Sequence, residues 1–98
     1  MLKLIKVGLV AVVMVLGVMS AWAGSKEDFN KGWDYHFAGK KSEALLFWRR
    51  SAEAGYAEAQ HLLGIIYLEG RGVLRDHKTA LRWFKAAGFN GHADAQFN

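Results

Sequence analysis

A repeat of 36 residues within a chain of 98 is the feature that most restricts how this protein can fold. The segment 44–60, ALLFWRRSAEAGYAEAQ, aligns without gaps with the segment 80–96, ALRWFKAAGFNGHADAQ. Bulky, small and glycine positions stay in phase, and Gly55 aligns with Gly91. Such a period is typical of arrays in which each unit buries its apolar face against the next one.

A fainter copy lies upstream at an offset of 32 residues, where Gly32 and Tyr35 align with Gly64 and Tyr67. The four-residue difference falls in the loop inside each unit, where insertions are tolerated. Apolar and small residues at helical spacing predict two helices in each unit. The expected helices span residues 26–38, 41–54, 57–68 and 77–87, and the start of a fifth is expected at residues 92–98.

Glycine and aspartate mark the expected helix ends. Gly55, Gly88 and Gly91 are predicted to end helices, because glycine adopts the left-handed conformation at little cost. Asp76 is placed to cap the fourth helix by accepting bonds from free amides of its first turn. These features predict an all-α fold, a short α-solenoid of antiparallel helix pairs. The repeat units are expected at about residues 26–55, 57–91 and, in part, 92–98.

The first 23 residues have the pattern of a secretory signal peptide. Lys3 and Lys6 precede an unbroken apolar run, and small residues stand where a signal peptidase cleaves, up to Ala23. We expect cleavage after Ala23, a mature chain from Gly24 to Asn98, and a periplasmic or secreted location. The stretch from Val7 to Ala23 has 17 residues, fewer than the roughly 20 of a typical membrane span. A retained membrane anchor stays as the alternative.

Charge and cysteine content limit the classes of partner. Without Lys3 and Lys6, Lys and Arg fall from 13 to 11, while all 9 acidic residues follow Ala23, so the mature net charge is +2. Such a weak charge, spread along the chain, does not indicate a nucleic acid partner. After cleavage, no membrane partner is expected either. The sequence has no cysteine, which excludes the disulfide framework common in small exported domains.

The segment 57–91 has small, aromatic and glycine residues at the positions of a known helical repeat. It resembles the Sel-one-like repeat, a branch of the tetratricopeptide superfamily. The first unit lacks the Gly-Val-x-x-Asp loop and is more similar to a plain tetratricopeptide unit. The positions that carry the resemblance are Ala57, Ala59, Leu63, Gly64, Tyr67, Gly70, Gly72, Val73, Asp76, Ala80, Trp83, Phe84, Ala86, Ala87 and Gly91.

The resemblance implies a right-handed solenoid that acts as an adaptor for another protein or peptide. Some exported relatives are described as penicillin-binding or β-lactamase-like, so a cell-wall or β-lactam hydrolase is the alternative. Those relatives are rich in cysteine, which this chain lacks. An incomplete third repeat also raises the possibility of self-association through the C-terminal segment 92–98.

No motif of enzymatic chemistry accompanies the repeat. The serines lack a nucleophile motif such as Gly-x-Ser-x-Gly, and Gly70-Arg71-Gly72 is too short to cradle a phosphate. The four histidines include no pair at the i, i+4 spacing of helical metal ligands. We therefore expect no catalytic residue, no metal and no cofactor.

One face of the array is the better candidate for function. In helix-pair solenoids the first helix of each unit lines the concave side. The residues opposite the packing stripe of these helices form an apolar and aromatic strip with polar edges, which suits a peptide or helix partner. Packing between the units is the alternative role for the same side chains. The candidate partner-binding residues are Phe29, Trp33, His36, Glu58, His61, Ile65 and Leu68.

Overall fold

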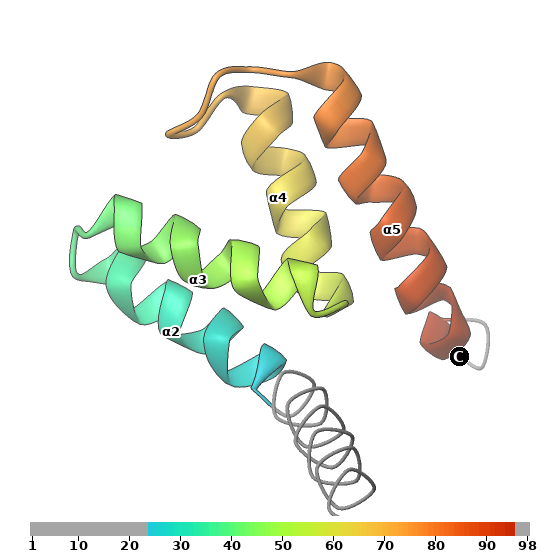
Figure 1. The fold of residues 1–98 in the computed structure, drawn as a ribbon, viewed down its shortest axis with the longest axis horizontal. Coiled ribbons are helices and arrows are strands. Elements are labelled where there is room, and N and C mark those ends of the chain that lie inside the picture. The colour runs from blue at the N-terminus through green and yellow to red at the C-terminus, as the bar shows by residue number, and fades with distance from the viewer. Residues whose placement is uncertain (1–23, 96–98) are drawn as a thin grey trace, which may run out of the picture.

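The computed structural model describes residues 24–95, and their side chains up to Gly91. Four helices follow one another: α2 (Ser25–Phe37), α3 (Lys41–Glu53), α4 (Ala57–Glu69) and α5 (His77–Ala95). Helices α2 and α3 form one antiparallel pair, α4 and α5 form the next, and α3 packs on α4 between them (Figure 1). The described residues contain no strand. The predicted all-α solenoid of helix pairs is therefore confirmed.

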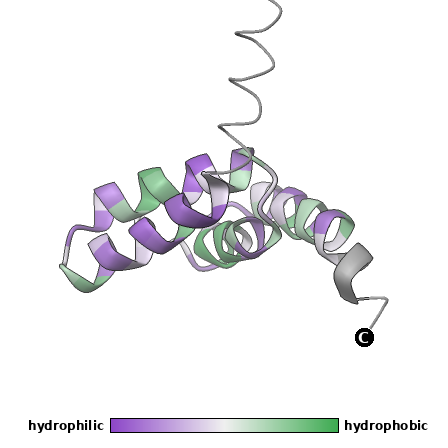
Figure 2. Cartoon of the chain, turned by 90° about the horizontal axis from the view of Figure 1, so that it is seen from below, coloured by the Kyte–Doolittle hydropathy of each residue, from purple (hydrophilic) through white to green (hydrophobic). Residues whose placement is uncertain are grey.

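The expected signal peptide, residues 1–23, lies outside the described residues. Among the residues that are described, no helix is both long and apolar enough to cross a membrane. Of the four described helices, α4 is the most apolar, and it lies between the α2/α3 pair and α5 (Figure 2). An apolar helix in the middle of an array is buried from both sides, as a repeat architecture requires.

Each unit is held together by an aromatic ring that lies on a helical glycine. A Cβ atom built on Gly32 of α2 would come within 2.2 Å of the Trp48 ring of α3. A Cβ on Gly64 of α4 would come within 2.6 Å of the Phe84 ring of α5. Only glycine lets the two helix backbones approach closely enough to hold a ring between them. The same contact therefore occurs in both units, at the positions that the repeat aligns.

The core lies mainly at the junction of the two units. Side chains of α3 and α4 alternate there, and polar groups close the junction at its edge. Gln60 Nε2 donates to the Ala52 carbonyl at 3.0 Å, and Asn90 Nδ2 donates to Gln60 Oε1 at 2.9 Å. The nitrogen and the oxygen of the buried Gln60 amide are thereby both hydrogen-bonded, which avoids the cost of an unpaired buried amide. The buried apolar cluster consists of Ala44, Trp48, Ala52, Ala59, Leu63 and Ile66.

The expected helix boundaries agree with the structure up to α5. Gly55 has φ +95° and ends α3, as predicted. Asp76 caps α5: its Oδ1 accepts from the amides of Lys78 and Thr79 at 3.1 and 3.2 Å, and its Oδ2 accepts from the Thr79 hydroxyl at 2.7 Å. The cap prediction is therefore confirmed.

The prediction that Gly88 and Gly91 end the fourth helix is wrong. Helix α5 runs through both glycines to Ala95, so no separate helix begins at residue 92. Glycine permits a turn but does not impose one. After Gly55 the turn is stabilised because α4 packs on α3, whereas no described helix packs beyond Gly91, and the backbone continues its helical hydrogen bonds. Residues 96–98 lie outside the described part of the chain.

Candidate partner-binding surface

An apolar hollow lies where α2, α3, α4 and the loop after α4 meet, and we call it the Trp33 cavity. Its volume is about 530 Å³, within the usual range of small-ligand pockets. Its lining is mainly apolar, because the ring of Trp33 and three aliphatic side chains from the facing helices converge there. The apolar lining residues are Trp33, Leu45, Trp48, Leu62 and Ile66.

Aromatic rings continue from this cavity to the surface. Trp33 lies edge-on against buried Trp48, with ring centroids 4.9 Å apart, and stacks on Phe37 at 5.9 Å. Phe37 does not line the cavity but is 79 % exposed, so an aromatic face next to the Trp33 ring is available to a partner. Exposed aromatic rings beside a hollow are typical of anchor points in protein interfaces.

The rim of the Trp33 cavity is cationic. Lys41, Arg71 and His36 are among its lining residues, and no acidic residue is among those described. Arg71 also forms an ion pair with Glu69, so part of its charge is already compensated. Lys41 makes no such pair among the described contacts. The rim therefore favours a partner with a negative group, which would also speed its association.

The seven predicted binding residues do not line one hollow. Trp33 and His36 line the Trp33 cavity, whereas Glu58 and His61 line a shallow groove between α4 and α5. Phe29 lies against the ring of Tyr56, with centroids 5.3 Å apart. The remaining two residues lie on α4: Ile65 is half-buried and Leu68 is exposed.

Sequence reasoning missed the loop and the second helix of the first unit as contributors to the cavity. Arg71 stands in the loop between α4 and α5, and Lys41 begins α3. The available signal was the alignment of the two loops: the four extra residues in the second unit make room for Arg71 to reach back towards the first. Leu45 of α3 lines the cavity as well.

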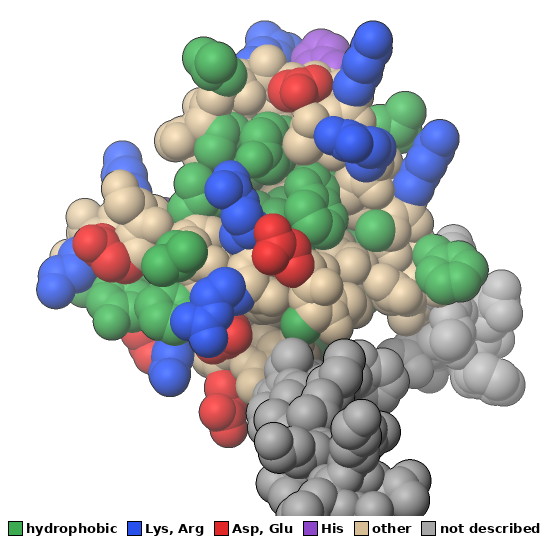
Figure 3. Space-filling view, in the orientation of Figure 1, with side chains coloured by type: hydrophobic (Ala, Val, Ile, Leu, Met, Phe, Trp, Pro, Cys, Tyr) green, Lys and Arg blue, Asp and Glu red, His purple; other side chains and the backbone are tan. Residues whose placement is uncertain are grey.

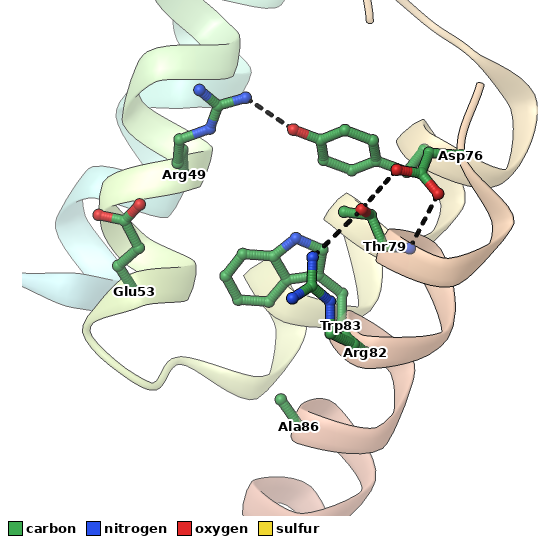
Figure 4. Close-up of a pocket in the computed structure, with 8 residues that line it drawn as sticks. Arg49, Glu53, Asp76, Thr79, Arg82, Trp83 and Ala86 are labelled. Atoms are coloured by element: carbon green, nitrogen blue, oxygen red, sulfur yellow. Dashed lines mark hydrogen bonds between the residues drawn. The ribbon is translucent and has the colours of Figure 1, made fainter. Parts of the chain in front are cut away.

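A second, more open hollow lies between α3 and α5, with a volume of about 700 Å³ (Figure 4). Here Arg49 Nη2 donates to the Tyr67 hydroxyl at 2.9 Å, and Asp76 and Thr79 belong to the α5 cap. Apolar side chains lie between charged groups of both signs on this face (Figure 3). Because Arg49 and Tyr67 bridge α3 and α4, this surface contributes to the junction of the units.

Two ionisable groups have shifted pKa values for local reasons. Hydrogen bonds from the Thr79 hydroxyl and amide hold the pKa of Asp76 below its usual value, because they favour the carboxylate. Burial raises the pKa of Tyr56, and the nearby carboxylate of Glu58 adds to the effect. Asp76 is a helix cap and Tyr56 precedes α4, so both shifts follow from structural contacts.

Two serines of α3 lie in different surroundings. Ser51 is fully buried and its hydroxyl donates to the Ser25 carbonyl. Ser42 is exposed at the edge of the Trp33 cavity. Across the described part of the chain, no group of three His, Cys, Asp or Glu residues is arranged to hold a metal ion.

Comparison with known proteins assigns the repeats. The Sel1 repeat model matches twice, over residues 23–56 and residues 57–92. Together these matches cover more than half of the chain. They divide it at the same place as the internal alignment, between α3 and α4.

Two curated proteins of Arabidopsis thaliana are similar to parts of the chain. The ERAD-associated E3 ubiquitin-protein ligase component HRD3B is 43 % identical over 54 residues, which is 54 % of this chain and 9 % of that protein. The F-box protein At1g70590 is 36 % identical over 63 residues, which is 64 % of this chain and 17 % of that protein. The chain thus spans less than a fifth of the length of either relative.

Proposed function

We propose that this chain, which belongs to the Sel1 repeat family, is an exported adaptor that holds a partner protein in the Trp33 cavity. Sel1 repeats are units of protein–protein interaction, so the chain is a protein-interaction module. The observation that carries the finer proposal is the cavity itself. It combines an apolar floor with a cationic rim, and the exposed ring of Phe37 stacks on Trp33, one of its lining residues.

The chemistry of the cavity defines the partner segment. A bulky aliphatic or aromatic side chain fits the floor between Trp33 and Leu62, where it would remove apolar surface from water. A carboxylate next to that side chain would lie near Lys41, whose charge is not compensated by a described ion pair. The proposed ligand is therefore a peptide segment in which a large apolar residue stands beside Asp or Glu.

Two synthetic peptides test this proposal with the purified protein. One alternates leucine with aspartate, and its counterpart carries lysine in place of aspartate. We expect saturable binding of the acidic peptide in a calorimetric titration, and binding of the basic peptide at least tenfold weaker. Lys41→Glu should weaken the acidic peptide about tenfold, whereas Lys85→Glu, a charge reversal on exposed α5, should not. Equal affinity for both peptides, or equal loss in both variants, would contradict the proposal.

A pull-down connects this binding to a natural partner. The protein and its Lys41→Glu and Lys85→Glu variants serve as baits in the exported fraction of the source cells. We expect one protein to be retained by the original chain and by Lys85→Glu but lost with Lys41→Glu. Retention by all three baits would assign the partner to another surface.

The role we propose is non-catalytic. It is supported by the burial of Ser51, whose hydroxyl is already engaged, and by the adaptor character of the family. The alternative of a cell-wall or β-lactam hydrolase gains no support from the described geometry. It would be established by hydrolysis of a chromogenic β-lactam that disappears in a Ser42→Ala variant.

Export is part of the same proposal and has a direct test. Its support is the leader pattern that ends at Ala23. Mass spectrometry of the protein from its source cells should give Gly24 as the first residue. A chain that begins at Met1 and is recovered with membranes would instead establish an anchored adaptor.

A further inference from the structure

The second unit has an open face where the first unit has a filled one. In the first unit, Trp48, Ser51 and Ala52 of α3 are 6 %, 0 % and 1 % exposed. Helix α4 begins against this face: Tyr56 lies on the ring of Phe29, and Gln60 donates to the Ala52 carbonyl. The face of one unit is thus the docking site for the first helix of the next.

The repeat places the equivalent face between α4 and α5. At an offset of 36, Trp48, Ser51 and Ala52 correspond to Phe84, Ala87 and Gly88. All three of these are half-buried rather than buried, and they line a shallow groove of about 580 Å³. We call it the α4/α5 groove. No described helix occupies it, and α5 forms that edge of the array (Figure 1).

The shape of the α4/α5 groove suits a helix. Ala87, Gly88 and Gly91 are small residues on α5, so another backbone can approach closely, and the Phe84 ring offers an apolar contact. His61 stands where Phe29 stands in the first unit, and its ring lies 5.3 Å from that of Phe84. An aromatic side chain in the position of Tyr56 would therefore meet a ring here too.

Helix α2 of a second copy does not suit the α4/α5 groove. Helix α4 packs on the first unit through three buried apolar residues, Ala59, Leu63 and Ile66. At the aligned positions α2 carries three exposed charged residues, Glu27, Lys31 and Asp34. Stacking α2 of a second copy on α5 would bury these three charged side chains against an apolar groove, which is strongly unfavourable. The occupant must present small and apolar residues instead, as α4 does.

We infer that the α4/α5 groove docks one helix of a partner protein, with the sequence pattern aromatic–Ala–x–Ala–Gln at its start. This is the pattern of Tyr56, Ala57, Ala59 and Gln60, which fill the equivalent face of the first unit. The surface is separate from the Trp33 cavity, so the two sites would hold two segments. Failure of either experiment leaves the other proposal standing.

The test uses the chain's own helix as the probe. A fluorescent peptide of residues 56–69 is titrated with the purified protein and followed by anisotropy. We expect saturable binding that weakens at least tenfold with Ala87→Arg, which places a charge in the groove. Ala38→Arg, the same change at an exposed site outside the groove, should leave affinity unchanged. Circular dichroism checks that both variants are folded.

A peptide variant keeps the test decisive if Ala87→Arg does not fold. A probe with Ala59→Glu should bind at least tenfold more weakly than the original peptide. The inference is overturned by absence of saturable binding at millimolar protein, or by equal binding of the two peptides. It is also overturned if sedimentation shows a dimer without peptide that Ala87→Arg alone disrupts, since the occupant would then be a second copy.

Discussion

The two repeat units contain the same glycine–aromatic contact but differ in how deeply they bury it. Trp48, against Gly32, is 6 % exposed because α2 and α4 lie on both sides of α3. Phe84, against Gly64, is half-buried because α5 has only α4 beside it among the described helices. The position of a unit in the array, more than its residues, therefore decides how much each aromatic side chain contributes to stability.

The units also differ in how their second helix begins. Asp76 caps α5 with three hydrogen bonds, whereas Lys40, at the equivalent position before α3, makes no side-chain cap. Helix α3 is stabilised by two neighbours, and α5 by one. The helix with less tertiary packing is thus the one with a side-chain cap. Both capping and tertiary packing stabilise short helices, so the cap adds stability where packing gives less.

The largest expected contrast comes from removing the two rings. Trp48→Ala should lower the free energy of unfolding by about 3–5 kcal/mol, as for buried aromatics in general. Phe84→Ala should cost about half as much, because its ring is already partly in water. Urea denaturation followed by circular dichroism measures both. Equal losses of unfolding free energy would show that the two rings are packed equally well and would contradict the difference in burial.

Trp48→Phe serves as the control for that series. The Nε1 of Trp48 is buried and has no acceptor among the described residues. Phenylalanine is the residue at the aligned position of the second unit. Replacing Trp48 with it removes an unpaired donor and leaves most of the apolar contact. We expect a much smaller loss than with alanine.

Filling the helical glycines should give the next largest effect. Alanine normally stabilises a helix relative to glycine by about 1 kcal/mol. Gly32→Ala should reverse that sign and destabilise by about 1–3 kcal/mol, because its Cβ would overlap the buried Trp48 ring. Gly64→Ala should destabilise less, since Phe84 can shift into the open groove. Thermal unfolding of both variants gives the order, and a stabilised Gly32→Ala would contradict the contact.

The aligned glycines Gly55 and Gly91 should respond with opposite signs. Gly55→Ala forces alanine into the left-handed region, φ +95°, and should destabilise by about 1–2 kcal/mol. Gly91→Ala should stabilise α5 by up to about 1 kcal/mol, because the new Cβ meets only Ala57 at 3.4 Å. Helix content and urea midpoints measure both. Two changes of the same sign would mean that both glycines sit in the same backbone conformation.

The smallest expected effect concerns the Asp76 cap and pH. Because the folded-state pKa of Asp76 is lowered, its contribution is complete above the unfolded pKa and is lost as pH falls through the folded one. Asp76→Ala should therefore lower the melting temperature at neutral pH and not at strongly acidic pH. Lys40→Asp should give the first unit a cap from backbone amides alone and a weaker pH dependence, because Glu43 stands where Thr79 donates its hydroxyl. A difference between Asp76→Ala and the original chain that is constant with pH would refute the charged cap.

The fold was predictable because the aligned positions of the repeat include both the residues that pack between helices and the residues that mark helix ends. Asp76 caps amides of its own first turn, and Gly55 stands where the next helix packs back on α3, so both predictions are confirmed. The continuation of α5 was not predictable from Gly91, since a glycine turn forms only where a following helix packs on it. Local sequence names the residues that permit a turn, and tertiary contact decides whether the turn forms.

The candidate binding surface was less predictable than the fold. Helical spacing groups residues of one helix, as with Trp33 and His36, which do line the same cavity. It does not say how α2 and α4 are rotated relative to each other, so residues from both were joined into one strip. The cavity also depends on Arg71, whose position is set by the path of the loop after α4. A loop has no repeating pattern of side chains from which its path could be predicted.

Gly91 has a consequence for how such a protein can lengthen over generations. Gene duplication that adds another 36 codons after this residue would supply a helix to pack on the exposed end, and the same glycine would then turn as Gly55 does. No existing codon of the second unit would need to change. The second unit therefore already carries the glycine that an internal position in an array uses, so a further unit could be added in a single step.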